Sequence, residues 1–199
     1  MGSINTIAVL YGGSSSEREV SIQSGMGVHN AICDLGYESD LIDFKDLNNL
    51  NELKIYDFIF IALHGFEGES GKLQKDLNDL NILYSGSGPE ACSKTWNKKI
   101  TKKILKENNI NTPISIGISE FSYQVANNGL NMSPYDCFRP FNYLFLKPDE
   151  DGSSIDIFKI SDDESLKNAY KKCTNNKRGF LFEEYIEGRE LTVTVIDKE

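Results

Sequence analysis

The chain has 199 residues, a formal net charge of −9 and a hydrophobic content of 39%. This length can bury a sizeable core and hold one or two domains. The acidic balance argues against nucleic acids and anionic membranes as partners, and no apolar run is long enough to span a bilayer. The four cysteines are scattered, as is typical of reduced thiols in a cytoplasmic protein, and two histidines are too few to favour a histidine-based metal site.

The most informative stretch joins a predicted strand over 7–11 to the sequence GGSSSEREVS. The strand is apolar throughout, which suits burial on both faces. The spacing of Ser16 and Glu19 is that of a capping box, which predicts a helix from about residue 17. Glu17 and Arg18 would then lie at the carboxyl end of a strand, where open α/β sheets bind ligands. On the spacing alone, a first-turn acid that only complements the helix dipole is an equally good interpretation.

Strands and helices alternate up to about residue 93, which favours a doubly wound parallel sheet. After the first strand we expect a helix over 17–35, a strand over 37–44, a loop or short helix over 45–53, a strand over 57–63 and a helix over 71–80. Apolar residues recur at helical spacing in the first helix, which predicts a buried stripe made by Val28, Ala31, Ile32 and Leu35.

The character of the chain changes near residue 93, where six lysines fall within the thirteen residues 94–106 of a predicted helix. Beyond it, periodicity and turn residues predict further elements. These are a strand up to 118, a patternless surface segment over 126–140, strands over 141–147 and 153–160, a helix over 162–173, a strand over 179–184 and a strand over 190–197.

Four segments, in chain order, resemble the signatures of one enzyme family. They are GGSSSEREVS after the first strand, FIALHGFEGESGKLQ at 60–74, YSGSG at 84–88, and LKP at 146–148 followed by DGSS at 151–154. Together they are similar to segments of the D-alanine–D-alanine ligases, which are members of the ATP-grasp superfamily. The resemblance covers almost the whole chain.

This resemblance implies an α/β fold in three parts. The N-terminal doubly wound parallel-sheet domain, which binds substrate, would span 1–93, and the central ATP-grasp α+β lobe would span 94–188. Residues 189–199 would begin the C-terminal ATP-grasp lobe, the rest of which is missing or truncated here. The predicted strand over 190–197 would be the first arm of a hairpin whose partner lies outside the chain.

The implied activity is ATP-dependent ligation of two D-alanines through an acyl phosphate, for peptidoglycan precursor synthesis in the cytoplasm. It implies ATP and Mg²⁺, with the magnesium ligands expected beyond Glu199, and a homodimer. Two alternatives stay open: another ATP-grasp carboxylate–amine ligase, and a non-catalytic fragment. We expect the 199-residue chain by itself to be inactive. The choice of D-alanine, D-lactate or D-serine as second substrate is not determined by these residues.

The resemblance also implies roles for individual residues. Glu17 would anchor the ammonium group of the first D-alanine, Val20 and His64 would line the same pocket, and Ser153 would be linked to Glu17 in catalysis. A carboxylate is a suitable ammonium acceptor. His64 would contact a carboxylate or phosphate, although a histidine that is only packed is equally compatible with the sequence.

The implied ATP site uses lysines as mobile phosphate-binding charges. Lys147, inside an apolar strand, is the stronger candidate, because Lys98 lies on a lysine-rich helix whose face could simply be solvated. The remaining implied ATP-binding residues are the phosphate-loop serines Ser153 and Ser154, the adenine-hinge residues Glu183, Glu184 and Ile186, and the ribose-binding Glu190. No metal ligand is assigned within the chain.

Overall fold

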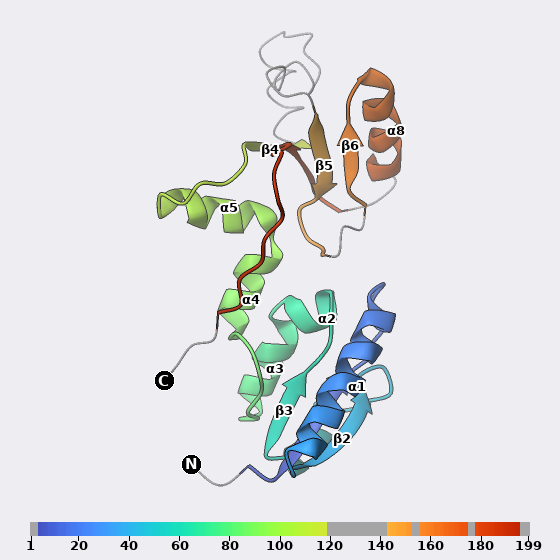
Figure 1. Ribbon diagram of the computed structural model, residues 1–199, viewed down its shortest axis with the longest axis vertical. Helices are drawn as coiled ribbons and strands as arrows, with labels where there is room; N and C mark the ends of the chain where they lie inside the picture. Colours follow the sequence, from blue (N-terminus) through green and yellow to red (C-terminus); the bar gives the residue numbers. More distant parts are fainter. Residues whose placement is uncertain (1–3, 119–142, 153–155, 175–177, 196–199) are drawn as a thin grey trace. The chain divides into compact units, whose positions relative to one another are not determined.

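The computed structural model describes residues 4–118, 143–152, 156–174 and 178–195 (Figure 1). The chain divides into two compact units. Unit 1 comprises Met1–Asn109 and Glu150–Ile155, and unit 2 comprises Ile110–Asp149 and Asp156–Glu199. In the described part of the chain, no helix is long and apolar enough to cross a membrane.

Unit 1 is built on a three-stranded parallel sheet. Strand β1 (Thr6–Tyr11) lies between β2 (Glu38–Asp43) and β3 (Phe58–Ile61). Val9 at the middle of β1 pairs with a residue of each neighbour. Ala8, Val9 and Leu10 are completely buried, as the apolar run predicted. The predicted parallel sheet and its three strands are confirmed.

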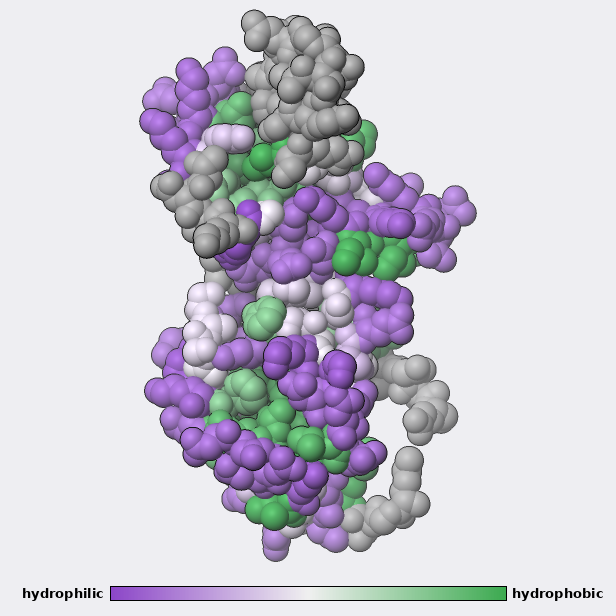
Figure 2. Space-filling model, turned by 180° about the vertical axis from the view of Figure 1, so that it is seen from behind, coloured by the Kyte–Doolittle hydropathy of each residue, from purple (hydrophilic) through white to green (hydrophobic). Residues whose placement is uncertain are grey.

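Helices and a 3₁₀ turn complete unit 1, and they surround one apolar core that includes Leu10, Leu53, Ile59 and Leu77. On the face seen in Figure 2, hydrophilic side chains surround smaller apolar areas. The elements are α1 (Arg18–Asp34), η1 (Leu50–Ile55), α2 (Phe66–Glu69), α3 (Lys72–Asp79), α4 (Pro89–Trp96) and α5 (Lys98–Glu107).

The stripe predicted for helix α1 is wrong. Ala31 and Leu35 are exposed, and the buried residues of the helix are Ser21 and Gly25. A side chain at Gly25 would collide with Tyr11 of β1. Small residues therefore let the helix approach the sheet closely, so packing against the strand rather than hydrophobicity decides which face is buried.

The start of helix α1 also differs from the prediction. The N-cap is Glu17, which makes no side-chain capping hydrogen bond, so the predicted capping box of Ser16 and Glu19 does not form. Ser15 organises this turn instead: its Oγ accepts from the Glu17 N–H at 3.2 Å, and its carbonyl accepts from the Arg18 N–H at 3.2 Å. The Glu17 carboxylate therefore does not serve its own helix as a cap.

Unit 2 contains a four-stranded antiparallel sheet with one described helix. The strands are β4 (Ser115–Gly117), β7 (Phe180–Glu184), β5 (Leu144–Pro148) and β6 (Phe158–Ile160), in that order across the sheet, and the helix is α8 (Asp163–Thr174). They enclose a second core that includes Leu144, Leu146, Ile160 and Phe182. The predicted segment over 126–140 lies outside the described residues.

The strand predicted over 190–197 is not found in its described part. Residues 190–195 have no regular secondary structure, and Leu191, Val193 and Val195 are at least 80% exposed. Alternating β-branched residues favour a strand only when a neighbouring strand pairs with them and covers one face. No described strand pairs with this segment.

Candidate functional site

Two carboxylates hold the loop that follows β1. Asp43, at the end of β2, accepts from the Gly13 N–H at 3.1 Å and from both terminal nitrogens of Arg18 at 3.0 and 2.5 Å. Arg18 also donates to the Gly13 carbonyl at 2.7 Å. Glu67, in α2, accepts from the Ser14 N–H at 2.8 Å and from its hydroxyl at 2.6 Å. The loop is thus tied to both neighbouring strand ends.

Gly13 is required at this turn. Its φ of +71° lies in the left-handed region, which residues with a Cβ adopt at a cost. A side chain there would also collide with the Glu67 carboxylate. The loop can therefore pass between Asp43 and Glu67 only because the residue is glycine.

This loop presents Glu17 as a buried acid at the carboxyl end of β1. The residue is 6% exposed. A Cβ on Gly65 would lie 3.0 Å from Glu17 Oε2, and one on Gly152 would lie 3.8 Å from the same oxygen. The carboxylate therefore lies beside the backbone of two segments that are far apart in sequence.

His64 follows β3 and lies at the same end of the sheet. Its Nε2 is 3.2 Å from Ser24 Oγ, and its Nδ1 is 3.7 Å from Glu69 Oε1. The same Glu69 oxygen accepts from the Gly65 N–H at 3.1 Å. Ser15 donates from its hydroxyl to the His64 carbonyl at 3.1 Å. The His64 side chain is 33% exposed. Polar contacts at both ring nitrogens position the imidazole.

Val20 and Ser153, the other residues predicted to bind the first substrate, are not placed beside Glu17 and His64 by any described contact. Val20 is 51% exposed on α1, and Ser153 lies outside the described residues, as does Ser154 of the predicted phosphate loop. The structure thus brings Glu17 and His64 to one sheet edge: the Ser15 hydroxyl bonds to the backbone of both, and the Glu17 carboxylate lies beside Gly65, the residue after His64.

Lys98 is the first residue of α5 and does not belong to a solvated face. Its Nζ donates to the Asp151 carbonyl at 2.6 Å. Asn97 caps the helix by accepting from two backbone N–H groups, and its amide donates to Glu150 Oε1 at 3.0 Å. These contacts hold residues 150–151 against the start of α5. Lys98 therefore supports the segment that precedes the predicted phosphate loop.

In unit 2, the predicted ATP residues Lys147 and Glu183 form an ion pair with each other, on neighbouring strands β5 and β7. Their side chains are 18% and 8% exposed, respectively. Glu184 accepts from the Ile114 N–H at 3.1 Å through its carboxylate. Two further predicted residues of this site, Ile186 and Glu190, are exposed to solvent.

Sequence reasoning did not assign roles to Asp43, Glu67 or Glu69. Glu67 and Glu69 stand inside the segment FEGES that follows His64, so their position in a recognised signature was the available signal. Asp43 ended a predicted strand and showed no comparable signal. In the described residues, no group of three or more His, Cys, Asp or Glu side chains could hold a metal ion.

We expect the Asp43–Arg18 pair to make the stability of unit 1 depend on pH in the acid range. The hydrogen bond from Arg18 lowers the pKa of Asp43 from 3.8 to about 2. Because the folded-state pKa lies below the ordinary value, the stabilisation is complete above about pH 4 and is lost as the pH falls toward 2. Asp43→Asn should therefore lower the free energy of unfolding by roughly 1–2 kcal/mol at neutral pH.

Thermal unfolding of the Asp43→Asn variant and the unaltered chain, measured at a series of pH values, tests this expectation. The difference in Tm should shrink as the pH falls from about 4 to 2. Asp34→Asn, on the exposed last turn of α1, is the matched control. A difference that stays constant through the acid range would contradict the assignment.

Solved structures of known enzymes identify the structural class to which this fold belongs. Solved structures with the same mixed α/β fold include a D-alanine–D-alanine ligase from Bacillus anthracis, 30% identical with a TM-score of 0.73 over 92% of this chain and 58% of that one. The same enzyme complexed with ATP is 28% identical with a TM-score of 0.74, over 94% of this chain and 60% of that one. The chain thus has the fold of an ATP-grasp ligase.

Relatives found by sequence similarity point to the same family of ligases as the solved structures. A D-alanine–D-alanine ligase of Bordetella pertussis is 38% identical over 96% of this chain, and one of Thermotoga maritima is 34% identical over 97%. The family model for the D-ala D-ala ligase C-terminus matches residues 136–199. The resemblance to D-alanine–D-alanine ligases is therefore confirmed over nearly the whole chain. The chain spans 58% and 60% of the length of these two relatives.

Proposed function

We propose that this chain is part of an ATP-dependent ligase that joins two D-alanines to D-alanyl-D-alanine, a precursor of peptidoglycan. The names of its relatives support this activity. The observation in the chain that carries it is Glu17, a buried carboxylate held at the carboxyl end of β1 by a loop with fixed geometry. A buried acid at this edge of an α/β sheet suits an ammonium ligand.

In this proposal, Glu17 accepts hydrogen bonds from the ammonium group of the first D-alanine. His64 contacts its carboxylate or the phosphate that forms on it, and Val20 covers the methyl group. The contacts of Ser15 and Glu69 would orient His64 for this role, because they fix the backbone and approach one ring nitrogen. Ser153 would link the phosphate loop to Glu17.

In this proposal, the predicted ATP residues bind the nucleotide. Lys98, Lys147, Ser153 and Ser154 would bind the phosphates, whereas Glu183, Glu184 and Ile186 would bind adenine and Glu190 the ribose. Binding to Lys147 would have to compete with its ion pair to Glu183. Mg²⁺ would neutralise phosphate charge when bound. Among the described residues, no group of three or more His, Cys, Asp or Glu side chains could hold it.

We further propose the domain division 1–93, 94–188 and 189–199, a homodimer, and a cytoplasmic location. The resemblance to the ligase family supports each of these. In the same proposal, residues that relatives carry beyond the matched part complete the C-terminal lobe, so residues 1–199 alone do not turn over substrate.

D-serine is a second candidate for the amine substrate, because one solved relative is a D-Ala:D-Ser ligase. The VanG D-Ala:D-Ser ligase of Enterococcus faecalis is 25% identical with a TM-score of 0.70, over 94% of this chain and 64% of that one. The first-substrate site would be shared between the two activities. The second acceptor would then be the point of difference.

The proposed function is tested with the complete gene product that contains these residues. With ATP and Mg²⁺, phosphate release should depend on D-alanine, and mass spectrometry should detect the dipeptide. D-serine and D-lactate, each supplied together with D-alanine, identify the acceptor from the mass of the product. Residues 1–199 expressed alone serve as the comparison and should show no D-alanine-dependent phosphate release. An ATP hydrolysis rate that does not change when any D-amino acid is added would rule the proposal out.

A further inference from the structure

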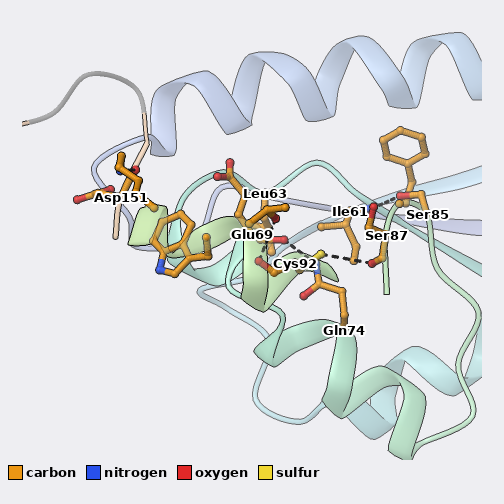
Figure 3. A pocket seen from close by; sticks show the side chains of 14 residues that line it. Ile61, Leu63, Glu69, Gln74, Ser85, Ser87, Cys92 and Asp151 are labelled. Atoms are coloured by element: carbon orange, nitrogen blue, oxygen red, sulfur yellow. Dashed lines mark hydrogen bonds between the residues drawn. The ribbon is translucent and has the colours of Figure 1, made fainter. Parts of the chain in front are cut away.

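Unit 1 has cavities at both ends of its parallel sheet. The cavity of about 650 Å³ in Figure 3 lies at the carboxyl end of β3 and is lined by Lys98, so it belongs with the candidate site described above. Another cavity, of about 510 Å³, lies at the amino end, where β1 begins at Thr6 and β2 at Glu38. Because Glu17 and His64 lie at the carboxyl end, the ligase proposal does not use the cavity at the amino end.

The cavity at the amino end is lined by an exposed cysteine, Cys33, on the last turn of α1. Figure 1 shows α1 beside β2, which is an edge strand of the sheet. The other lining residues include Thr6, Glu38, Ser39, Asp40 and Tyr56. The thiol is therefore accessible to small molecules that enter this cavity.

A histidine lies next to this thiol. His29 stands one helical turn before Cys33, so the two side chains lie on the same face of α1. His29 Nε2 is 3.9 Å from Cys33 Sγ, and His29 Nδ1 is 2.9 Å from the hydroxyl oxygen of Ser39 on β2. When the Nδ1–H donates to Ser39, the lone pair of Nε2 is directed toward the thiol. A nucleophile, a base and a group that orients the base are the parts that activate a cysteine.

The other described cysteines are less suited to react. Cys173 is buried, and burial raises the pKa of its thiol to about 11. Burial also raises the pKa of Cys92, whose Sγ donates to the Ser87 carbonyl at 3.4 Å. A raised pKa leaves little thiolate, which is the nucleophilic form, at neutral pH. Among the described cysteines, Cys33 is therefore the one that combines exposure with a neighbouring base.

The charges of the cavity favour a cation. Glu38 and Asp40 line it, and none of the described residues that line it is a lysine or an arginine. The Tyr56 hydroxyl donates to the Asp40 carboxylate at 2.9 Å and so holds it in place. The chain as a whole has a net charge of −9. An anion that approaches the thiol is therefore repelled, whereas a cation is attracted.

We propose that Cys33 is a modification site that forms mixed disulfides with small cationic disulfides, with His29 as the base. The Cys33 thiol gives its proton to His29 Nε2, and the thiolate attacks one sulfur of the small disulfide. A new S–S bond to Cys33 forms as the S–S bond of the small molecule breaks. The departing thiolate takes the proton from His29. Cys33 is thereby oxidised, and the departing half of the small molecule is reduced to a thiol. This reaction does not depend on the ligase activity.

The test uses the complete protein, with its thiols reduced, at neutral pH. Three disulfides of similar size differ in charge: cystamine is cationic, hydroxyethyl disulfide is neutral and dithiodipropionate is anionic. Peptide mapping by mass spectrometry measures the rate of mixed-disulfide formation at each cysteine, and each rate is divided by that of the same disulfide with mercaptoethanol. Cys33 should react about three- to tenfold faster with cystamine than with the neutral disulfide, and slowest with dithiodipropionate. High salt should reduce these differences.

His29→Gln tests the base. This variant should slow the reaction of Cys33 with all three disulfides by about five- to thirtyfold, because a free thiol is only a few per cent thiolate at neutral pH. Asn30→Gln, at the adjacent exposed position of α1, is the matched control and should leave the rates unchanged. The circular dichroism spectrum of each variant should match that of the unaltered protein.

Glu38→Gln tests the charge of the cavity. It should reduce the preference of Cys33 for cystamine by about twofold or more and leave the rate with the neutral disulfide unaltered. Glu52→Gln removes an exposed charge from a residue that does not line this cavity. It should change neither rate, and this separates the local carboxylate from the net charge of the protein.

Equal Cys33 rates in His29→Gln and in the unaltered protein would overturn the proposal, because the thiol would then react without a base. A rate with cystamine that is no higher than the rate with dithiodipropionate would also overturn it, since the cavity would then not select a cation. Absence of a mixed disulfide at Cys33 after treatment with cystamine would have the same consequence.

Discussion

Glu17→Gln in the complete protein should raise the KM for the first D-alanine about ten- to a hundredfold and leave the KM for ATP nearly unchanged. The glutamine keeps the size of the side chain and removes its charge. Glu17 is 6% exposed, so its hydrogen bond to an ammonium group would form away from water and be worth roughly 1.5–3 kcal/mol. Steady-state kinetics with D-alanine and ATP varied in turn measures both constants.

The matched control is Glu19→Gln, which removes an exposed charge from the same helical turn. It should leave both constants unchanged, and this separates a specific contact from a general loss of negative charge. A Glu17→Gln enzyme with unaltered D-alanine kinetics would remove Glu17 from the substrate site. An equal rise in both constants would instead indicate a disturbed loop.

Lys147→Met should destabilise unit 2 by about 3–5 kcal/mol, the effect expected when one partner of a buried ion pair is removed. Glu183 is only 8% exposed at its side chain, so the carboxylate would remain buried without its lysine. Amide hydrogen exchange along β5 and β7 measures the change where it occurs. Exchange of these amides should accelerate, whereas that of β1 in unit 1 should not.

The double variant Lys147→Met with Glu183→Leu tests whether the broken ion pair causes the loss of stability. Replacing both charges by apolar groups of similar size is often neutral for stability, so the double variant should regain most of the protection. Lys167→Met, an exposed lysine of α8, is the control and should have little effect. If the double variant is as unstable as Lys147→Met, the loss of stability does not come from the broken ion pair.

Local patterns in the sequence predicted the sheet of unit 1 and two of its helices, but they did not predict the break at Asn97 that separates α4 from α5. The apolar run of β1 and the alternation around it predicted the parallel sheet, and the helices α1 and α3 lie within one or two residues of the expected bounds. These features depend on hydrophobic periodicity and on nearby Gly and polar residues. The resemblance to the ligase family, rather than these local patterns, implied that Glu17 and His64 line one pocket.

Contacts between distant residues were not predictable in this way. The sequence alone determined that a strand, a Gly-Gly turn and a helix would present Glu17, because each of those is a local property. Only the tertiary structure decided that Asp43 and Glu67 hold the turn, that Lys147 pairs with Glu183, and that Ser39 lies beside His29. The physical reason is that such pairs are selected by strand register and helix packing, which bring together residues that no sequence spacing relates.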